Sequence, residues 1–219
     1  TDIVRHPDFL NMIMPPLIAR WNAVDAAAPP GSGGGDPHQF KPLLEGLTSV
    51  AVAVGPAFEP FAPPVFKKCL DIIETTLIVM LSGHDGMGGG VGDPMEMGDY
   101  IDFDPMCVAL DLIAGIAEGV GAPCEAMLRA SNLLDLLMHC LGYEHTDVQQ
   151  SAFGVLGEVG KACPGYIVGA LGKICPIALA AMERTSDRAG FAGGYTAEGE
   201  DAWGGSDDEG EDDMGDDVT

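Results

Sequence analysis

Basic and aromatic residues are scarce in this chain, and their scarcity argues against several classes of function. Only 10 of the 219 residues are Lys or Arg, against 34 Asp or Glu, which gives a net charge of −24. A chain this acidic repels the phosphate backbone, so we expect no direct binding to DNA or RNA. The partners that such a charge favours are basic proteins or peptides. Aromatic residues make up only 6% of the chain, a composition that suits closely packed helices better than strands.

Closely spaced cysteine motifs and long apolar runs are missing from the sequence as well. Six cysteines occupy positions 69, 107, 124, 140, 163 and 175, none forms a CxxC motif, and most lie inside apolar helical stretches. Free cysteines of this kind behave as small buried hydrophobes and are typical of a reducing compartment. No apolar run approaches the roughly 18 residues that a membrane-spanning helix requires, so we expect no membrane insertion.

The chain does contain a repeated helical pattern, because each of three stretches carries a narrow polar stripe on an otherwise apolar helix. The stretches are FKPLLEGLTSVAVAVG from Phe40, DPMCVALDLIAGIAEGVG from Asp104 and TDVQQSAFGVLGEVGKAC from Thr146. The segment LIAGIAEGVG from Leu112 aligns with VLGEVGKACP from Val155 at an offset of 43 residues. HEAT and armadillo repeats have periods of about 40–47 residues. The first two stretches lie about 66 residues apart, and an insertion at 83–104 accounts for the surplus.

We therefore expect an all-α HEAT-repeat α-solenoid of antiparallel helix pairs over residues 1–182, with about three pairs and one additional helix. The predicted helices cover 8–23, 39–54, 62–81, 104–120, 123–141, 146–162 and 165–182. Composition predicts a flexible linker at 25–38, an acidic Gly-rich loop at 83–104 and a disordered acidic tail at 183–219. The tail holds eleven acids and no Lys or Arg between Glu198 and Asp217. The chain begins with Thr1, and we expect it to be a fragment of a longer protein.

The polar stripes follow the helical spacing i, i+4, i+7 and i+11, or the related i, i+3, i+7 and i+11, which places their members on one face. Their members are Lys41, Glu45, Thr48 and Val52 in the first stretch, Cys107, Asp111, Ala114 and Glu118 in the second, and Gln150, Phe153, Gly157 and Lys161 in the third, with Glu158 adjacent. One interpretation is that each stripe is the solvated side of an amphipathic helix. The other is a row of carboxylates and amides that binds an extended basic peptide through charge-assisted hydrogen bonds.

No motif in the sequence indicates catalysis. The segment GMGGGVG at 86–92 follows no predicted strand and lacks the Lys-Ser/Thr of a phosphate-binding P-loop. The aspartates between 99 and 104 lack the glycine and the closing glutamate of an EF-hand, and His139 and Cys140 fit no standard zinc spacing. We therefore expect neither enzymatic activity nor a cofactor or metal ion.

The helical stretches resemble the transportin family, beta-karyopherins that import proteins carrying proline-tyrosine nuclear localisation signals. The resemblance rests on FLNMIMPPLIARWN, FKPLLEGLTSVAVAVGPAFEPFAPPVFKKCLDIIETTL, MCVALDLIAGIAEGVGAPCEAMLRASNLLDLLMHC and DVQQSAFGVLGEVGKACPGYIVGALGKICPIALAAM, which cover most of residues 8–182. It implies that the chain is a middle-to-C-terminal section of a much longer HEAT-repeat receptor. It also implies that the striped helices are the inner helices of their repeats, with the stripe on a concave cargo-binding face.

The resemblance further implies which residues contact cargo and which partners the protein has. The implied cargo contacts are Phe40, Glu45, Thr48, Cys107, Asp111, Glu118, Gln150 and Glu158. The implied function is nuclear import: binding of basic or proline-tyrosine nuclear localisation signals, with release by the Ran GTPase in the full-length protein. Nucleoporins are further implied partners, and the implied localisation is shuttling between cytoplasm and nucleus.

The sequence departs from the family pattern after residue 182. The family's next inner helix carries a tryptophan that is central to cargo binding, whereas here the sequence becomes glycine-rich and acidic, and Trp203 within it is not an equivalent. Two other functions remain open from the residues alone. One is a HEAT-repeat scaffold for protein–protein assembly without a transport role, and the other is an acidic chaperone that acts through its tail.

Overall fold

The computed structural model describes residues 7–27, 37–85 and 102–193, and within these ranges all regular secondary structure is helical. The helices are α1 (Pro7–Ala27), α2 (Pro37–Val54), η1 (Gly55–Phe61), α3 (Ala62–Asp85), α4 (Asp104–Val120), η2 (Ala122–Cys124), α5 (Glu125–Arg129), α6 (Leu133–Gly142), α7 (Thr146–Ala162), α8 (Pro164–Val168) and α9 (Leu171–Gly193). The three striped stretches thus form α2, α4 and α7, and the predicted all-α fold is confirmed.

The chain divides into two units, residues 1–179 and residues 180–219. Helix α9 begins in the first unit and continues into the second. The packing described below is that of the first unit. Among the described residues, no helix combines the length and apolarity that crossing a membrane requires.

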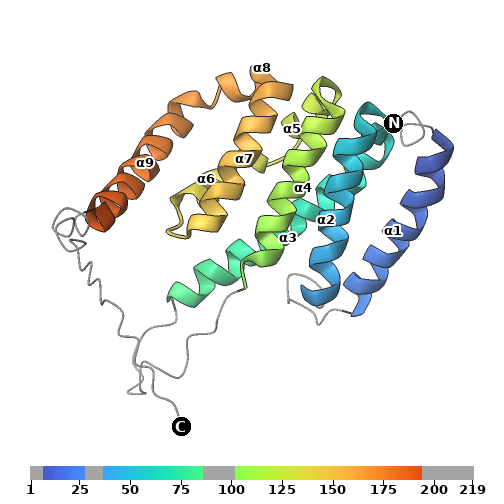
Figure 1. Cartoon of the computed structure of the whole chain (residues 1–219), viewed down its shortest axis with the longest axis horizontal. Helices are drawn as coiled ribbons and strands as arrows, with labels where there is room; N and C mark the ends of the chain where they lie inside the picture. The colour runs from blue at the N-terminus through green and yellow to red at the C-terminus, as the bar shows by residue number, and fades with distance from the viewer. Residues whose placement is uncertain (1–6, 28–36, 86–101, 194–219) are drawn as a thin grey trace, which may run out of the picture. The chain divides into compact units, whose positions relative to one another are not determined.

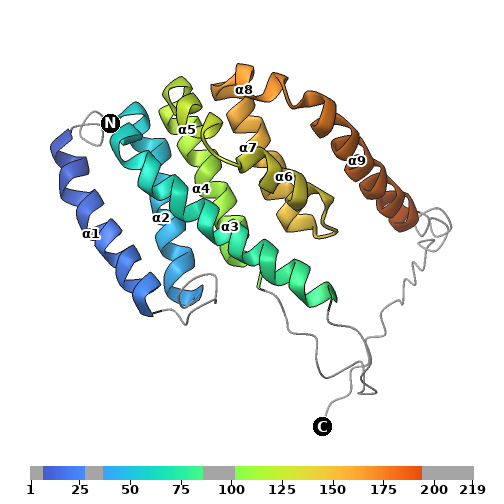
Figure 2. The same cartoon turned by 180° about the vertical axis from the view of Figure 1, so that it is seen from behind.

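Helix α4 is the centre of the first unit. It packs most extensively against α2 on one side and α7 on the other, so that these three helices lie side by side (Figure 1). Helices α3 and α6 form a second layer behind them, α3 packed on α4 and α6 packed on α7 (Figure 2). Successive long helices run in opposite directions. This is the stacking of antiparallel pairs that the repeat period predicts.

The ends and the faces of α4 explain why the segment is helical and central. Asp104 and Pro105 occupy its first turn, where an acid complements the helix dipole and a proline loses no hydrogen bond. Gly121 follows its last turn with φ of +71°, a conformation that glycine adopts without steric cost, and its amide N–H donates to the Ala117 carbonyl at 3.0 Å. Between these ends most side chains are buried, since neighbouring helices cover α4 on several sides.

Two glycines set the short distance between α2 and α4. A Cβ atom at Gly119 would lie 2.2 Å from the Ala51 carbonyl oxygen, and one at Gly115 would lie 2.8 Å from the Thr48 methyl group. Neither separation is possible between non-bonded atoms, so the backbones approach this closely at Gly119 only because it lacks a side chain, and a methyl group at Gly115 would have to displace the Thr48 side chain. Gly115 and Gly119 are one helical turn apart and therefore lie on the same face.

The single helix predicted for 123–141 is wrong, because the structure divides this segment into η2, α5 and α6. The break falls at Ser131 and Asn132. The Ser131 hydroxyl donates to the Leu128 carbonyl at 2.7 Å, and the Asn132 amide donates to the Glu74 carboxylate of α3. Short polar side chains that bond nearby groups in this way compete with the helical hydrogen-bond ladder.

Several predicted boundaries also move. The helix predicted for 165–182 divides into α8 and α9, and α9 continues to Gly193, past the predicted start of the tail at 183. Helix α3 runs to Asp85, and the ends of α1 and α2 take residues from both sides of the predicted linker 25–38. The rest of the predicted linker, loop and tail, at 28–36, 86–101 and 194–219, lies outside the described residues.

Candidate functional site

The polar stripes of α2, α4 and α7 meet at Asp111, near the middle of α4. Although Asp111 keeps an exposed surface, the surrounding protein raises the pKa of its carboxyl group above the ordinary value of 3.8, chiefly through burial. The Ser151 hydroxyl of α7 lowers this pKa through a hydrogen bond, while the Glu45 carboxylate of α2 raises it. Asp111 therefore interacts with both neighbouring helices at once.

A second connection between stripes lies toward the C-terminal ends of α4 and α7. The Lys161 ammonium donates to the Glu158 carboxylate at 2.7 Å, and this bond raises the pKa of Lys161. The Glu118 carboxylate of α4 adds to the same increase, so Glu118 and Glu158 lie within electrostatic reach of one cation. We call the surface formed by Glu45, Asp111, Ser151, Glu118 and Glu158 the acidic face.

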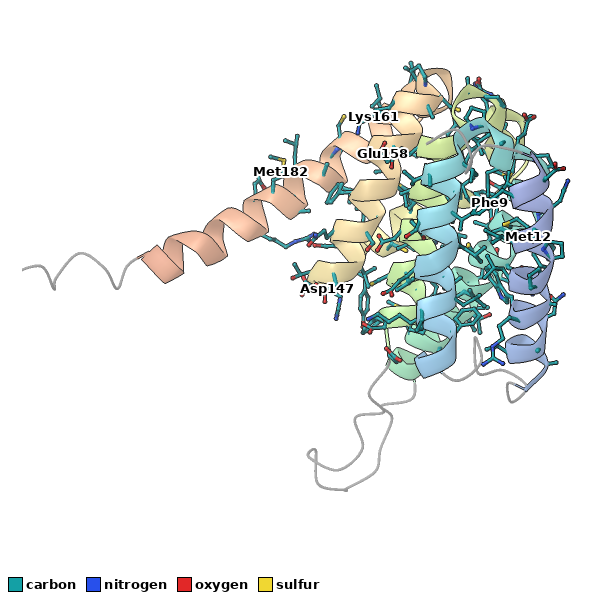
Figure 3. All side chains as sticks on the ribbon, turned by 45° about the vertical axis from the view of Figure 1, so that its right-hand side comes forward. Phe9, Met12, Asp147, Glu158, Lys161 and Met182 are labelled. Atoms are coloured by element: carbon teal, nitrogen blue, oxygen red, sulfur yellow. The ribbon has the colours of Figure 1, made fainter. Side chains whose placement is uncertain are left out.

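Polar groups accompany α7 along most of its length. Figure 3 shows Asp147 at the start of the helix, with Glu158 and Lys161 near its other end. Asp147 acts on α4 too, because its negative charge contributes to the raised pKa of Cys107. The acidic face is therefore continued by a further carboxylate toward the N-terminal ends of α4 and α7.

The two lysines of the stripes are already paired with carboxylates. Lys41 of α2 donates to Asp104 of α4 at 2.6 Å, and Lys161 pairs with Glu158. Within the described part of the chain, no lysine or arginine forms a salt bridge with Glu45, Asp111 or Glu118. Lys41 and Lys161 do lie within electrostatic reach of Glu45 and Glu118, so among the described residues the four carboxylates of the acidic face outnumber the cations beside them.

Short neutral side chains lie beside the carboxylates. Cys107 is half-buried, and burial together with nearby aspartates raises the pKa of its thiol to about 11, so the thiol is protonated at neutral pH. The half-buried Thr48 donates its hydroxyl to the Leu44 carbonyl at 2.9 Å, within its own helix. Gln150 is exposed and presents its amide to solvent.

Phe40 differs from the other implied cargo contacts because its side chain is fully buried. It is 0% exposed and packs edge-on against Trp21 of α1, with ring centroids 5.6 Å apart at 85°. In this arrangement its ring fixes α2 on α1 and does not reach the surface. The apolar ring is more stable in the core than beside carboxylates, which accounts for its position.

Ser151 was not predicted from the sequence, although a signal for it existed. The i, i+4, i+7, i+11 spacing that fits Cys107 and Asp111 also fits Asp147, Ser151, Gly154 and Glu158 on α7. The set predicted above begins at Gln150 instead and is displaced by three residues. Asp147 and Ser151 interact with residues of α4, and Glu158 bonds to Lys161, which itself lies within electrostatic reach of Glu118 on α4.

The fold and this surface define a helical-repeat protein with an acidic face on α2, α4 and α7. No family model matches the sequence. Known relatives do: the chain is 36% identical to Transportin-1 of Oryza sativa subsp. japonica over 159 residues, and 34% identical to Transportin-1 of Homo sapiens over 171 residues. It is also 28% identical over 157 residues to Importin subunit beta-2 of Schizosaccharomyces pombe.

These alignments cover 73%, 78% and 71% of this chain in turn, but only 15–17% of each relative. The chain therefore spans about one sixth of the length of its relatives. The matched part is similar to a segment of these transportins and importin beta-2 proteins, which confirms the resemblance seen in the sequence.

Proposed function

We propose that this chain is the part of a nuclear import receptor that binds basic or proline-tyrosine nuclear localisation signals of cargo on the acidic face. Its action is binding without catalysis. In the full-length protein, Ran GTPase releases the cargo, nucleoporins are further partners, and the receptor shuttles between cytoplasm and nucleus. The similarity to transportins supports the receptor role, and the geometry of α2, α4 and α7 supports the place of binding.

The observation that carries the proposal is the set of carboxylates on adjacent helices, of which Glu45, Asp111 and Glu118 form no salt bridge among the described residues. Glu45 raises the pKa of Asp111, which means that the two negative charges repel each other across the boundary between α2 and α4. An arginine or lysine side chain placed between them replaces this repulsion with two attractions. Each partly desolvated pair of this kind contributes about 1–3 kcal/mol to binding.

The face has two sites where a cation would fit. One lies between Glu45 and Asp111, and the other lies beside Glu118, where a cargo cation would compete with Lys161. Ser151 keeps Asp111 in its ionised form by donating a hydrogen bond, since its hydroxyl lowers the pKa of that carboxyl group. The sites are on successive parts of α4, which suits an extended peptide with more than one basic residue.

Neutral groups on the same helices would contact the backbone of the peptide. Gly154 and Gly157 of α7 are exposed and have open space where a Cβ atom would stand, so a peptide can approach the helix closely. The Gln150 amide can both donate to and accept from a peptide bond. Phe40 takes no part in this contact and acts through the position of α2.

The test is a fluorescence anisotropy titration of a labelled basic proline-tyrosine signal peptide with the purified chain. We expect binding that weakens as salt is added. We also expect Asp111→Lys with Glu118→Lys to weaken binding roughly tenfold or more for each lost pair. The matched control is Asp71→Lys with Asp135→Lys, which changes the net charge equally on exposed positions of α3 and α6, in the other layer.

Two results would contradict the proposal. Equal loss of binding in both double variants would mean that only net charge matters. Loss of binding on deletion of residues 194–219, with no effect of the α4 substitutions, would favour a chaperone that acts through its tail. This deletion leaves α9 complete, so a change in binding would not arise from a shortened helix.

A further inference from the structure

Two of the six cysteines lie against each other in the core. All six cysteines are free, and the Sγ atoms of Cys124 and Cys163 are 3.5 Å apart. Their side chains are 3% and 1% exposed. Cys124 ends η2, the short turn that follows α4, and Cys163 directly follows α7, so the pair bridges two neighbouring repeats.

The pair has no other strong partner that would explain its position. The further sulfur contacts are weak ones, from Cys163 to the carbonyl oxygens of Gly121 and Ala122 at 4.0 and 3.9 Å. No group of three or more metal-ligating side chains occurs among the described residues, so nothing here points to a metal site built around the pair. The sulfur atoms are already close to van der Waals contact, and an S–S bond of about 2.05 Å needs a further approach of roughly 1.5 Å.

We propose that Cys124 and Cys163 are a redox pair that forms a reversible disulfide between the turn after α4 and the end of α7 when the protein meets a peroxide. The thiolate of one cysteine attacks the O–O bond, which leaves a sulfenic acid and, after proton transfer, one water. The second thiolate then displaces hydroxide from the sulfenic sulfur and forms the S–S bond, and the hydroxide takes up a proton to give the second water. Two S–H bonds are lost, and the peroxide is reduced to two waters.

The surroundings of the pair make this reaction slow in the resting protein. Burial and the neighbouring Cys163 raise the pKa of Cys124 to about 12, and only a thiolate attacks a peroxide. Hydrogen peroxide is small enough to reach the pair during local opening of the helices. The pair therefore responds to sustained oxidation and not to brief exposure.

The bond would act on the two helices that carry most of the acidic face. Asp111 and Glu118 lie on α4, and Ser151 and Glu158 lie on α7. A covalent link at the C-terminal ends of these helices fixes their separation there, and it also closes a loop of 39 residues in the unfolded chain. Formation of the disulfide does not depend on the proposed import function.

The experiment is oxidation of the purified full chain with hydrogen peroxide, followed by blocking of free thiols, proteolysis without reductant and mass spectrometry. We expect a cross-linked peptide that contains Cys124 and Cys163 and disappears with dithiothreitol. We also expect the thermal unfolding temperature to rise by on the order of 10 °C, from the entropy of closing a loop of this length.

The control variants are Cys124→Ala and Cys163→Ala, each of which should abolish the rise, and Cys69→Ala, which should retain it. Cys69 is equally buried but lies on α3. The proposal would be overturned if other cysteine pairs became cross-linked instead. It would also be overturned if both thiols stayed free in the folded protein while the unfolded protein became cross-linked. The peptide map of the unsubstituted chain shows which cysteines are cross-linked, even where a variant folds poorly.

Discussion

The two sides of α4 solve the same packing problem with different chemistry. Toward α2 the backbones meet closely at Gly119, and polar interactions of Lys41 with Asp104 and of Glu45 with Asp111 lie along the same contact. Toward α7 the contact is in part polar, because Ser151 interacts with both Asp111 and Cys107. Two helices whose backbones are in contact cannot change their separation without losing close packing. Polar side chains at a helix contact, in comparison, can exchange hydrogen-bond partners. The α2 side therefore holds two backbones at a fixed separation, whereas on the α7 side a polar side chain, Ser151, makes the contact with α4.

The largest expected effect comes from Phe40, whose ring packs α2 against α1. Phe40→Ala should lower the free energy of unfolding by about 3–5 kcal/mol, because it removes a fully buried ring and leaves a cavity against Trp21. Phe153→Ala on α7 should cost only about 1–2 kcal/mol, since that ring is half-buried. Urea unfolding followed by circular dichroism measures both, and equal losses would contradict the difference in burial between the two rings.

A smaller effect, of opposite sign on the two sides, is expected for glycine-to-alanine changes. Gly119→Ala should destabilise the protein by about 1–3 kcal/mol, because the new methyl group meets the Ala51 carbonyl. Gly154→Ala on α7 has open space and should stabilise by about 0.5–1 kcal/mol through helix propensity. The same urea experiment applies, and a stabilising Gly119→Ala would refute the close approach of α2 and α4.

The smallest effect concerns the pH dependence of stability that Asp111 causes. Burial and Glu45 raise the folded-state pKa of Asp111, so the folded protein holds that proton more tightly than the unfolded chain does. The ionised carboxylate therefore costs stability above this pKa, and the cost vanishes as the pH falls below the unfolded value near 3.9.

Asp111→Asn should then stabilise the protein at neutral pH relative to acidic pH, by at most about 0.5–1 kcal/mol because the side chain is partly exposed. Ser151→Ala should enlarge the dependence, since Ser151 lowers that pKa. Denaturant titrations across the acidic to neutral range measure this difference. A difference between Asp111→Asn and the unsubstituted chain that stays constant with pH would contradict the assignment.

The striped helices were predictable because their apolar spacing is long and regular, and α2, α4 and α7 begin and end close to the predicted residues. The break between α5 and α6 was not predictable, since it depends on hydrogen bonds from Ser131 and Asn132. The bond from Asn132 reaches Glu74 on another helix, α3. Local propensity contains no information about such a distant partner.

The site was predictable to the level of a face and not of each residue. Asp111 and Glu118 follow from spacing on α4, whereas the choice between the sets beginning at Asp147 and at Gln150 depends on how α7 is rotated about its axis. The burial of Phe40 likewise depends on Trp21, which lies across the linker on α1. The rotation of a helix and the packing of two segments that a linker separates are tertiary properties. The period of a single helix does not determine them.

The most direct measurement of the central claim, that the carboxylates of the acidic face pair with basic residues of cargo, is a charge-swap cycle. Asp111→Lys is combined with a signal peptide in which one basic residue at a time is replaced by Glu, and affinities are measured by anisotropy for all four combinations. If this claim is right, each change alone weakens binding, and one swapped pair recovers at least about 1 kcal/mol of the combined loss. Strictly additive losses at every basic position of the peptide would contradict it.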